Sequence, residues 1–184
     1  MVMKSGVNFD NNHGPVTILN KPNVIRASVV GQLVEILSQA NSISDNLSRV
    51  PAEIDLKINF NDLKRNRWIA ELYKQDSLIV DESIRSLDLL IPRGSEKLKR
   101  QMKGFYKQAL GRFSVQGGVL ELERVKVNSD NIIDEVIKYT RDLIDDCSNI
   151  NSGIYKEDID YGIQLIVSYS IIECVILENP NDHN

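Results

Sequence analysis

The sequence predicts a mainly α-helical bundle of five to six helices, with one or two short N-terminal or connecting β segments. Two observations support this prediction. Apolar residues recur every three or four positions over long stretches, which is the spacing of one helix face. Short, turn-rich segments join these stretches, as they do in helical bundles. With 184 residues, of which 42% are hydrophobic, the chain can bury one core without disulfides or metals.

The chain divides into one domain with two polar ends. Residues 1–14 are rich in Asn and Gly and poor in apolar groups, so we expect a flexible head over residues 1–22, with a short candidate strand in "GPVTIL" (14–19). We expect a single helical domain over residues 23–180 and a polar tail over residues 181–184.

The domain is expected to begin with a helix and an extended segment. Helical spacing of apolar residues predicts a helix from Val24 to about Ala40, for which Asn23 is a candidate N-cap. The stretch "EIDLKINFN" (53–61) alternates apolar and polar residues, which is the period of a half-buried strand or extended segment. Residues 16–19 are its candidate pairing partner.

Two long helical stretches come next. Asn61 is expected to cap the first, which continues to Leu90. Asp76 and Ser77 either interrupt it or lie on its solvent-exposed side; two helical pieces are favoured, and a continuous helix is the alternative. Ser95 is the expected cap of the second stretch. The apolar stripe of this second helix consists of Leu98, Met102, Phe105, Tyr106, Ala109 and Phe113.

The C-terminal third predicts a loop and two further helices. Residues 114–128 contain a Gly-Gly turn and predict a loop with one short strand. Ser129 or Asp130 opens the next helix. The last helix is expected from about Glu157 to Leu177, and it stops at the Asn-Pro pair because proline cannot continue a helix. Its apolar residues cover much of its circumference, so we expect it at the centre of the bundle.

Composition and charge narrow the class of protein. A formal net charge of −4 and a pI near 5.3 give no overall attraction to nucleic acid or anionic membranes. Cys147 and Cys174 match neither a metal-ligand spacing nor a disulfide framework, so we expect free thiols in a reducing compartment. The first residues lack the apolar core of a signal peptide, and residues 159–177 are too polar to span a bilayer. We therefore expect a cytoplasmic protein without membrane association.

The residues assemble no catalytic motif. His13 and His183 both lie in the polar ends, where no packed element would hold them for acid–base catalysis. The sequence contains no phosphate-binding loop, nucleophile elbow or zinc-binding helix motif. We therefore predict a protein that is not an enzyme and that uses no cofactor or metal. Six carboxylates cluster at the end of one predicted helix and the start of the next, and hard cations prefer such oxygen ligands. A structural or solvated role is favoured, because acidic residues in a first turn interact favourably with the helix dipole. The six residues are Asp142, Asp145, Asp146, Glu157, Asp158 and Asp160.

Positive charge is concentrated in one predicted helix. Seven basic residues and only Glu96 as an acidic one lie between Arg93 and Arg112. Lys99, Lys103 and Lys107 recur every four residues, so they share one side of the helix, opposite the apolar stripe. This side is either solvated or binds an anionic partner; an acidic protein surface is favoured over nucleic acid because no aromatic side chain is interleaved to stack bases. The candidate binding residues on this helix are Lys97, Lys99, Arg100, Lys103, Lys107 and Arg112.

A smaller basic cluster surrounds the only tryptophan. Lys64, Arg65 and Arg67 precede Trp68 directly. A tryptophan in this position serves either as part of the core or as an anchor in an interface, and the sequence leaves both open. Trp68 is therefore a second candidate partner-binding residue.

Three separated stretches resemble one known family. "PAEIDLKINFNDL" (51–63), "IPRGSEKLKRQMKGFY" (91–106) and "ECVILENP" (173–180) are together similar to the C-terminal helical domains of ABC three-component antiphage systems, relatives of the Lamassu defence group. The resemblance implies that a helical domain couples an effector to an SMC- or Rad50-like ATPase. Such domains usually follow an effector, whereas here fifty residues precede the match, so the chain is a stand-alone component, a truncated form or a relative with another use.

The resemblance also assigns structural roles to individual residues. It implies that Ile58 packs into the core and that Asn61 caps a helix at the entry to the domain. It implies that Cys174 and Pro180 mark the closing helix. The other residues at the entry are Pro51, Ile54 and Lys57.

These observations lead to one preferred hypothesis and two alternatives. The preferred one is a non-enzymatic helical adaptor in a multi-protein antiphage complex with an SMC- or Rad50-like ATPase and an effector subunit. It assembles with these partners or as a homodimer, and it meets nucleic acid only through the complex. The first alternative is a nucleic-acid-binding regulator that uses the basic helix over residues 96–112. The second is a metal-dependent enzyme that uses the carboxylates near residues 142–160.

Overall fold

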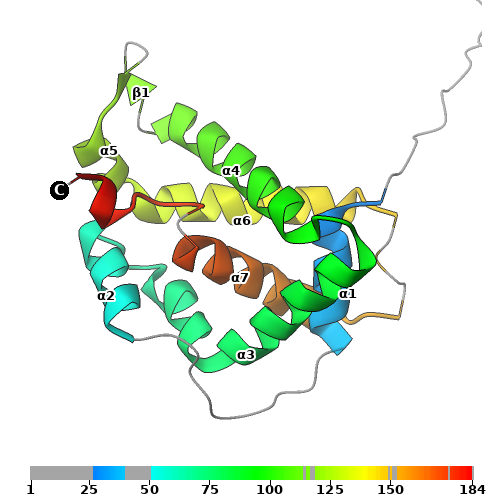
Figure 1. Cartoon of the computed structure of the whole chain (residues 1–184). Coiled ribbons are helices and arrows are strands. Elements are labelled where there is room, and N and C mark those ends of the chain that lie inside the picture. The colour runs from blue at the N-terminus through cyan, green and yellow to red at the C-terminus, as the bar shows by residue number, and fades with distance from the viewer. Residues whose placement is uncertain are drawn as a thin grey trace, which may run out of the picture.

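The computed structural model describes seven α-helices, one short β-hairpin and one 3₁₀ helix (Figure 1). The described residues are 27–39, 51–113, 115–116, 119–148, 150, 153–173 and 175–183. The helices are α1 (Val29–Gln39), α2 (Pro51–Phe60), α3 (Arg67–Leu90), α4 (Gly94–Phe113), α5 (Leu122–Val127), α6 (Ser129–Asp145) and α7 (Lys156–Ile172), followed by η1 (Pro180–His183). In the hairpin, β1 (Val115–Gln116) pairs antiparallel with β2 (Val119–Leu120). The predicted fold class, a mainly α-helical bundle, is confirmed.

Several predictions fall outside the described residues. They include the flexible head over residues 1–22, its candidate strand over residues 16–19 and the N-cap at Asn23. His13 and Cys174 lie outside them as well.

Helix α7 occupies the middle of the bundle and packs against α1, α3 and α6 (Figure 1). Its residues from Gly162 to Ile171 are almost all buried, which confirms the predicted central position. A Cβ added to Gly162 would lie 3.3 Å from Cγ1 of Val34, so the glycine allows α1 to approach α7 closely. The core around α7 therefore depends on a residue without a side chain at the α1 contact.

The closing helix ends earlier than the sequence predicts. Helix α7 stops at Ile172, and the backbone N–H groups of Val175 and Ile176 both donate to the carbonyl oxygen of Ser170, at 3.0 and 3.2 Å. The chain then turns at Leu177, whose φ is +63°. The predicted end at Leu177 is wrong because Ile176 and Leu177 are buried in a non-helical segment. Pro180 begins η1 and does not terminate α7.

Helix α2 replaces the predicted strand over residues 53–61. The buried positions are Ile54, Lys57, Ile58 and Asn61, which follow the spacing of a helix face. Leu56, which the alternation placed on the same side as Ile54, is 56% exposed. The prediction is wrong because two of the four buried residues are polar, so the true face did not stand out as apolar.

Helix α3 is continuous but irregular at one residue. It begins at Arg67 with Asn66 at its N-cap, so the predicted capping of this helix by Asn61 is wrong. Asp76 has non-helical dihedral angles (φ −117°, ψ 17°) inside the helix, in agreement with the two predicted pieces. The hydroxyl of Tyr161 on α7 donates to Oδ2 of Asp76 at 2.6 Å and so fixes the irregular turn against the central helix.

The sequence predicted two of the remaining helices, α4 and α6, but not the third, α5. Helices α4 and α6 lie where the sequence predicted them, and Ser129 is the first residue of α6. Helix α4 begins at Gly94, so Ser95 lies inside the helix and its predicted capping role is wrong. Helix α5 was predicted as part of a loop with a short strand, which is wrong for residues 122–127. Only Val125 of this short helix is buried, and a run this short has too few turns to show a helical period.

Candidate partner-binding surface

Helix α4 buries one side against α6 and α3 and leaves the other side in water. The predicted stripe is buried at Leu98, Met102 and Ala109, among others. Four cationic residues on the outward side are exposed, and they make no ion pair within the described residues. We call these four residues the basic face: Lys97, Arg100, Lys103 and Lys107.

Two predicted members of this cluster belong to the fold. The Lys99 ammonium lies 2.8 Å from Oε2 of Glu173 and 5.7 Å from the ring centroid of Tyr169. Desolvation lowers the pKa of Lys99, but the hydrogen bond to Glu173 and the nearby charges outweigh it, so the pKa lies above the ordinary value. Arg112 donates to Oε2 of Glu135 on α6 at 2.6 Å. Both side chains fasten α4 to neighbouring segments.

Other cations near the candidate sites are neutralised within the described residues. Arg93 pairs with Glu96 in the first turn of α4. In the cluster beside Trp68, Lys64 lies 2.9 Å from a carboxylate oxygen of Asp62. Two further pairs in that cluster are Arg65 with Asp134 and Arg67 with Glu71. The basic face differs from these cations because its charges have no such partner in the part of the chain that the structure describes.

Trp68 is surface-exposed. Its side chain is 46% exposed in the first turn of α3, so the core alternative is wrong. Figure 1 shows the start of α3 beside α2, away from the length of α4. The structure therefore does not join Trp68 to the basic face.

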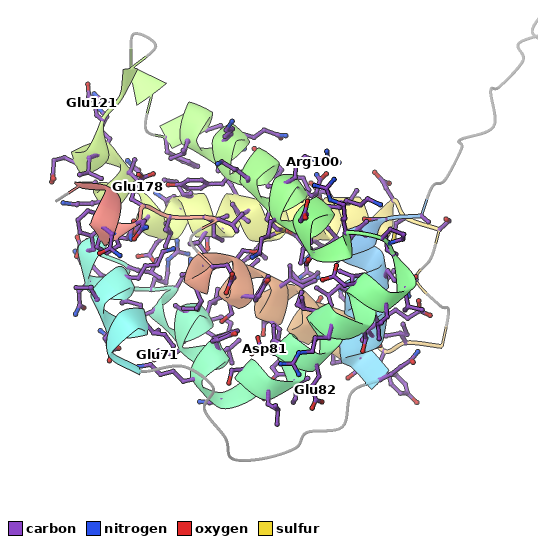
Figure 2. All side chains as sticks on the ribbon, in the orientation of Figure 1. Glu71, Asp81, Glu82, Arg100, Glu121 and Glu178 are labelled. Atoms are coloured by element: carbon purple, nitrogen blue, oxygen red, sulfur yellow. The ribbon has the colours of Figure 1, made fainter. Side chains whose placement is uncertain are left out.

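Two hollows adjoin the basic face at the start of α4. Arg100 projects from α4 near the ends of α1 and α6 (Figure 2). One hollow of about 410 Å³ is lined by Lys97 and Arg100 together with residues 27–30 of the α1 end and Asp146 of the α6 end. A second hollow of about 320 Å³ is lined by Arg93, Glu96, Lys97 and Arg100. Lys97 and Arg100 thus border recessed surface, which a bound group could enter.

The residues that the resemblance singled out form a buried connection. Pro51 is the first residue of α2, and Ile54 and Ile58 are buried as predicted. Asn61 donates through Nδ2 to the carbonyl oxygens of Lys57 and Glu178, both at 2.9 Å, and its Oδ1 accepts from the backbone N–H of Glu178 at 2.9 Å. Asn61 therefore connects the end of α2 to the C-terminal segment.

A tyrosine from α4 completes this connection. The hydroxyl of Tyr106 donates to Oε1 of Glu178 at 2.8 Å. Burial raises the pKa of Tyr106, and the nearby Glu178 carboxylate raises it further, so the phenol remains a neutral donor. We call Asn61, Tyr106 and Glu178 the polar latch. Sequence reasoning missed Glu178 because only the fold brings it to Asn61, 117 residues away.

The described residues assemble no metal centre of three or more His, Cys, Asp and Glu side chains. Of the carboxylates weighed above, Asp160 pairs with Arg141, and Asp142, Asp145 and Asp146 are exposed at the end of α6. His183 lies in η1. None of the helices in the described part is both long and apolar enough to cross a bilayer.

Comparison with known proteins gives no relative. No family model, curated protein or solved structure matches the chain.

Proposed function

We propose that this protein is a non-catalytic helical adaptor that holds an anionic partner on the basic face of α4. The supporting observation is the contrast between this face and the other two candidate cations of the same helix. Lys99 and Arg112 are paired with carboxylates of the fold, whereas Lys103 and Lys107 have no ion pair within the described residues. A row of exposed, unpaired cations gives little stability to the fold, but it accelerates and orients the docking of an acidic surface.

The sequence resemblance supplies the proposed setting. We propose that the adaptor works in an antiphage complex with an SMC- or Rad50-like ATPase and an effector subunit. The adaptor role needs only positioning, which agrees with a surface that offers charge and recessed space. Nucleic acid is expected to reach the adaptor through the complex.

Reversing the charge of the basic face tests this function. The variant Arg100→Glu, Lys103→Glu, Lys107→Glu is expected to lose its associated proteins when the tagged full-length chain is purified from its native cells at low salt. Lys99 is left intact because its replacement would place a second carboxylate beside Glu173. Mass spectrometry identifies the associated proteins, and an ATPase of the SMC or Rad50 type is expected among them.

A matched control separates local charge from net charge. Arg85, Lys138 and Lys156 are exposed on three other helices and make no ion pair within the described residues. Reversing these three changes the net charge by the same amount, and it is expected to leave the associated proteins bound. Equal loss in both triple variants, or unchanged association in the first, would contradict the proposed function.

A further inference from the structure

Two leucines are solvent-exposed at the corner between α3 and α4. Leu89 is 88% exposed and Leu90 is 63% exposed, although both belong to the last turn of α3. Leu87 in the same turn is fully buried, so the corner is held in place by other residues. Core packing therefore does not explain why residues 89 and 90 are apolar.

The corner is rigidly connected to the basic helix. The backbone N–H of Gly94 donates to the carbonyl oxygen of Ile91 at 2.9 Å, which closes a tight turn between the helices. The backbone N–H of Ser95 donates to Oδ1 of Asp88 at 2.8 Å across the same turn. A Cβ added to Gly94 would lie only 2.8 Å from Cγ of Leu87, so the two helix ends are in direct contact. Only six residues, which include this turn, separate the leucine pair from Lys97, the first residue of the basic face.

We infer that the leucine pair and the basic face bind one partner together, and that this partner is a protein surface with an apolar centre and acidic surroundings. The inference rests on the proposed function and names the class of partner. Apolar side chains at the centre of an interface provide most of its binding energy, and charges around them set orientation and association rate. Leu89 and Leu90 supply the apolar contact, and the basic face supplies the charges.

The same surface fits nucleic acid less well. A phosphate backbone pairs with lysines and arginines but leaves exposed leucines without an apolar contact. Single strands bind through aromatic side chains that stack on bases, and the exposed aromatic residues of the described part lie outside α4. A protein surface with apolar and acidic residues is the partner that contacts both the leucine pair and the basic face.

Site-specific photo-cross-linking in native cells tests this inference on the full chain. A photoreactive amino acid is placed at Leu90, at Lys103 or, as a control, at Lys138 on α6. We expect the same protein to be linked from positions 90 and 103 but not from position 138. Peptide mapping is expected to find the linked segment of that protein rich in Asp and Glu with apolar residues among them.

Binding of the purified partner then separates the two contributions. Leu89→Ser, Leu90→Ser is expected to weaken the affinity at least about tenfold without changing its dependence on salt. Arg100→Glu, Lys103→Glu, Lys107→Glu is expected to weaken the affinity and to reduce the salt dependence. A labelled DNA duplex and phosphatidylserine vesicles serve as the competing probes, and the leucine variant is expected to leave any weak binding to them unchanged.

Several results would overturn the inference. They are different proteins at positions 90 and 103, a second copy of this chain as the linked species, or DNA or lipid binding that the leucine variant weakens. Unchanged partner affinity in the leucine variant would also overturn it. In that case the proposed function still stands if charge reversal on α4 releases the partner, so the two failures are distinguishable.

Discussion

At the α2 end of the bundle, the polar latch bonds Asn61 and Tyr106 to Glu178, whereas on the outer side of α4 the basic face makes no ion pair within the described residues. Figure 2 labels one residue of each region, Glu178 and Arg100, which lie apart in that view. Both regions are rich in polar groups and both involve α4. The latch is largely buried and bonds to groups of the protein itself. The basic face is exposed and pairs with no carboxylate of the described residues.

That difference separates folding from binding. A buried polar group is unfavourable unless it is hydrogen-bonded, so each bond of the latch is needed once the C-terminal segment covers it. Exposed charges remain hydrated whether or not they are paired, so the fold does not require the basic face. Substitutions in the latch should therefore change stability, and substitutions in the basic face should change binding.

The largest expected effect comes from Asn61. Asn61→Ala removes three hydrogen bonds and leaves the backbone N–H and carbonyl of Glu178 without their side-chain partner. We expect the free energy of unfolding to fall by about 2–4 kcal/mol, measured by urea denaturation. Asn59→Ala, at an exposed position of α2, is the control and should change it by less than about 0.5 kcal/mol. A loss in Asn61→Ala no larger than in the control would show that the latch is not structural.

The latch also shows where sequence reasoning failed. The alternation of Ile54, Leu56 and Ile58 predicted a strand because apolar residues alone were used to define the buried side. The buried side of α2 includes Lys57 and Asn61, and their burial depends on a segment more than a hundred residues later in the chain. Long amphipathic helices such as α4 and α6 were predictable because their own apolar stripes define the buried side.

Tyr106 tests the second bond of the latch. Tyr106→Phe keeps the ring in the core and removes only the hydroxyl that donates to Glu178. We expect a loss of about 1–2 kcal/mol in the free energy of unfolding, because the Glu178 carboxylate loses a buried donor. Tyr155→Phe, at a strongly exposed tyrosine, is the matched control. If the Asn61 and Tyr106 substitutions are combined, the losses should not add, since both act on Glu178.

The candidate surface was predicted in part. Helical periodicity located the basic helix, and four of its six candidate residues form the exposed basic face. Lys99 and Arg112 could not be separated from them because Glu173 and Glu135 come from distant parts of the chain. The leucine pair was missed for the opposite reason: Leu90 continued the apolar pattern of α3, and the exposed end of that helix became visible only in the fold.

A smaller effect is expected at the turn between α3 and α4. The backbone N–H of Ser95 bonds to Asp88 and holds the pKa of that carboxyl below its ordinary value of 3.8. A lowered pKa stabilises the fold above pH 3.8, and this contribution disappears as the pH falls through the lower value of the folded state. Asp88→Asn should slightly reduce stability near neutral pH, because solvent screens this exposed carboxylate, and it should weaken the loss of stability below about pH 4.

Thermal denaturation between pH 2 and pH 7 measures this change. Asp145→Asn is the control, since Asp145 is exposed and its side chain makes no hydrogen bond or ion pair within the described residues. If Asp88→Asn and the wild type lose stability in parallel as the pH falls, the bond between Asp88 and Ser95 does not contribute to acid sensitivity.

The smallest effect on stability is expected where the effect on binding is largest. Arg100→Glu, Lys103→Glu, Lys107→Glu should change the free energy of unfolding by less than about 0.5 kcal/mol, because none of the three side chains pairs with a carboxylate within the described residues. Lys99→Ala should lower it more, because that substitution leaves the largely buried Glu173 carboxylate without its ammonium partner. Urea denaturation of the two variants side by side measures the contrast. Equal destabilisation would mean that the basic face serves the fold, and its proposed role in binding would then lose its physical basis.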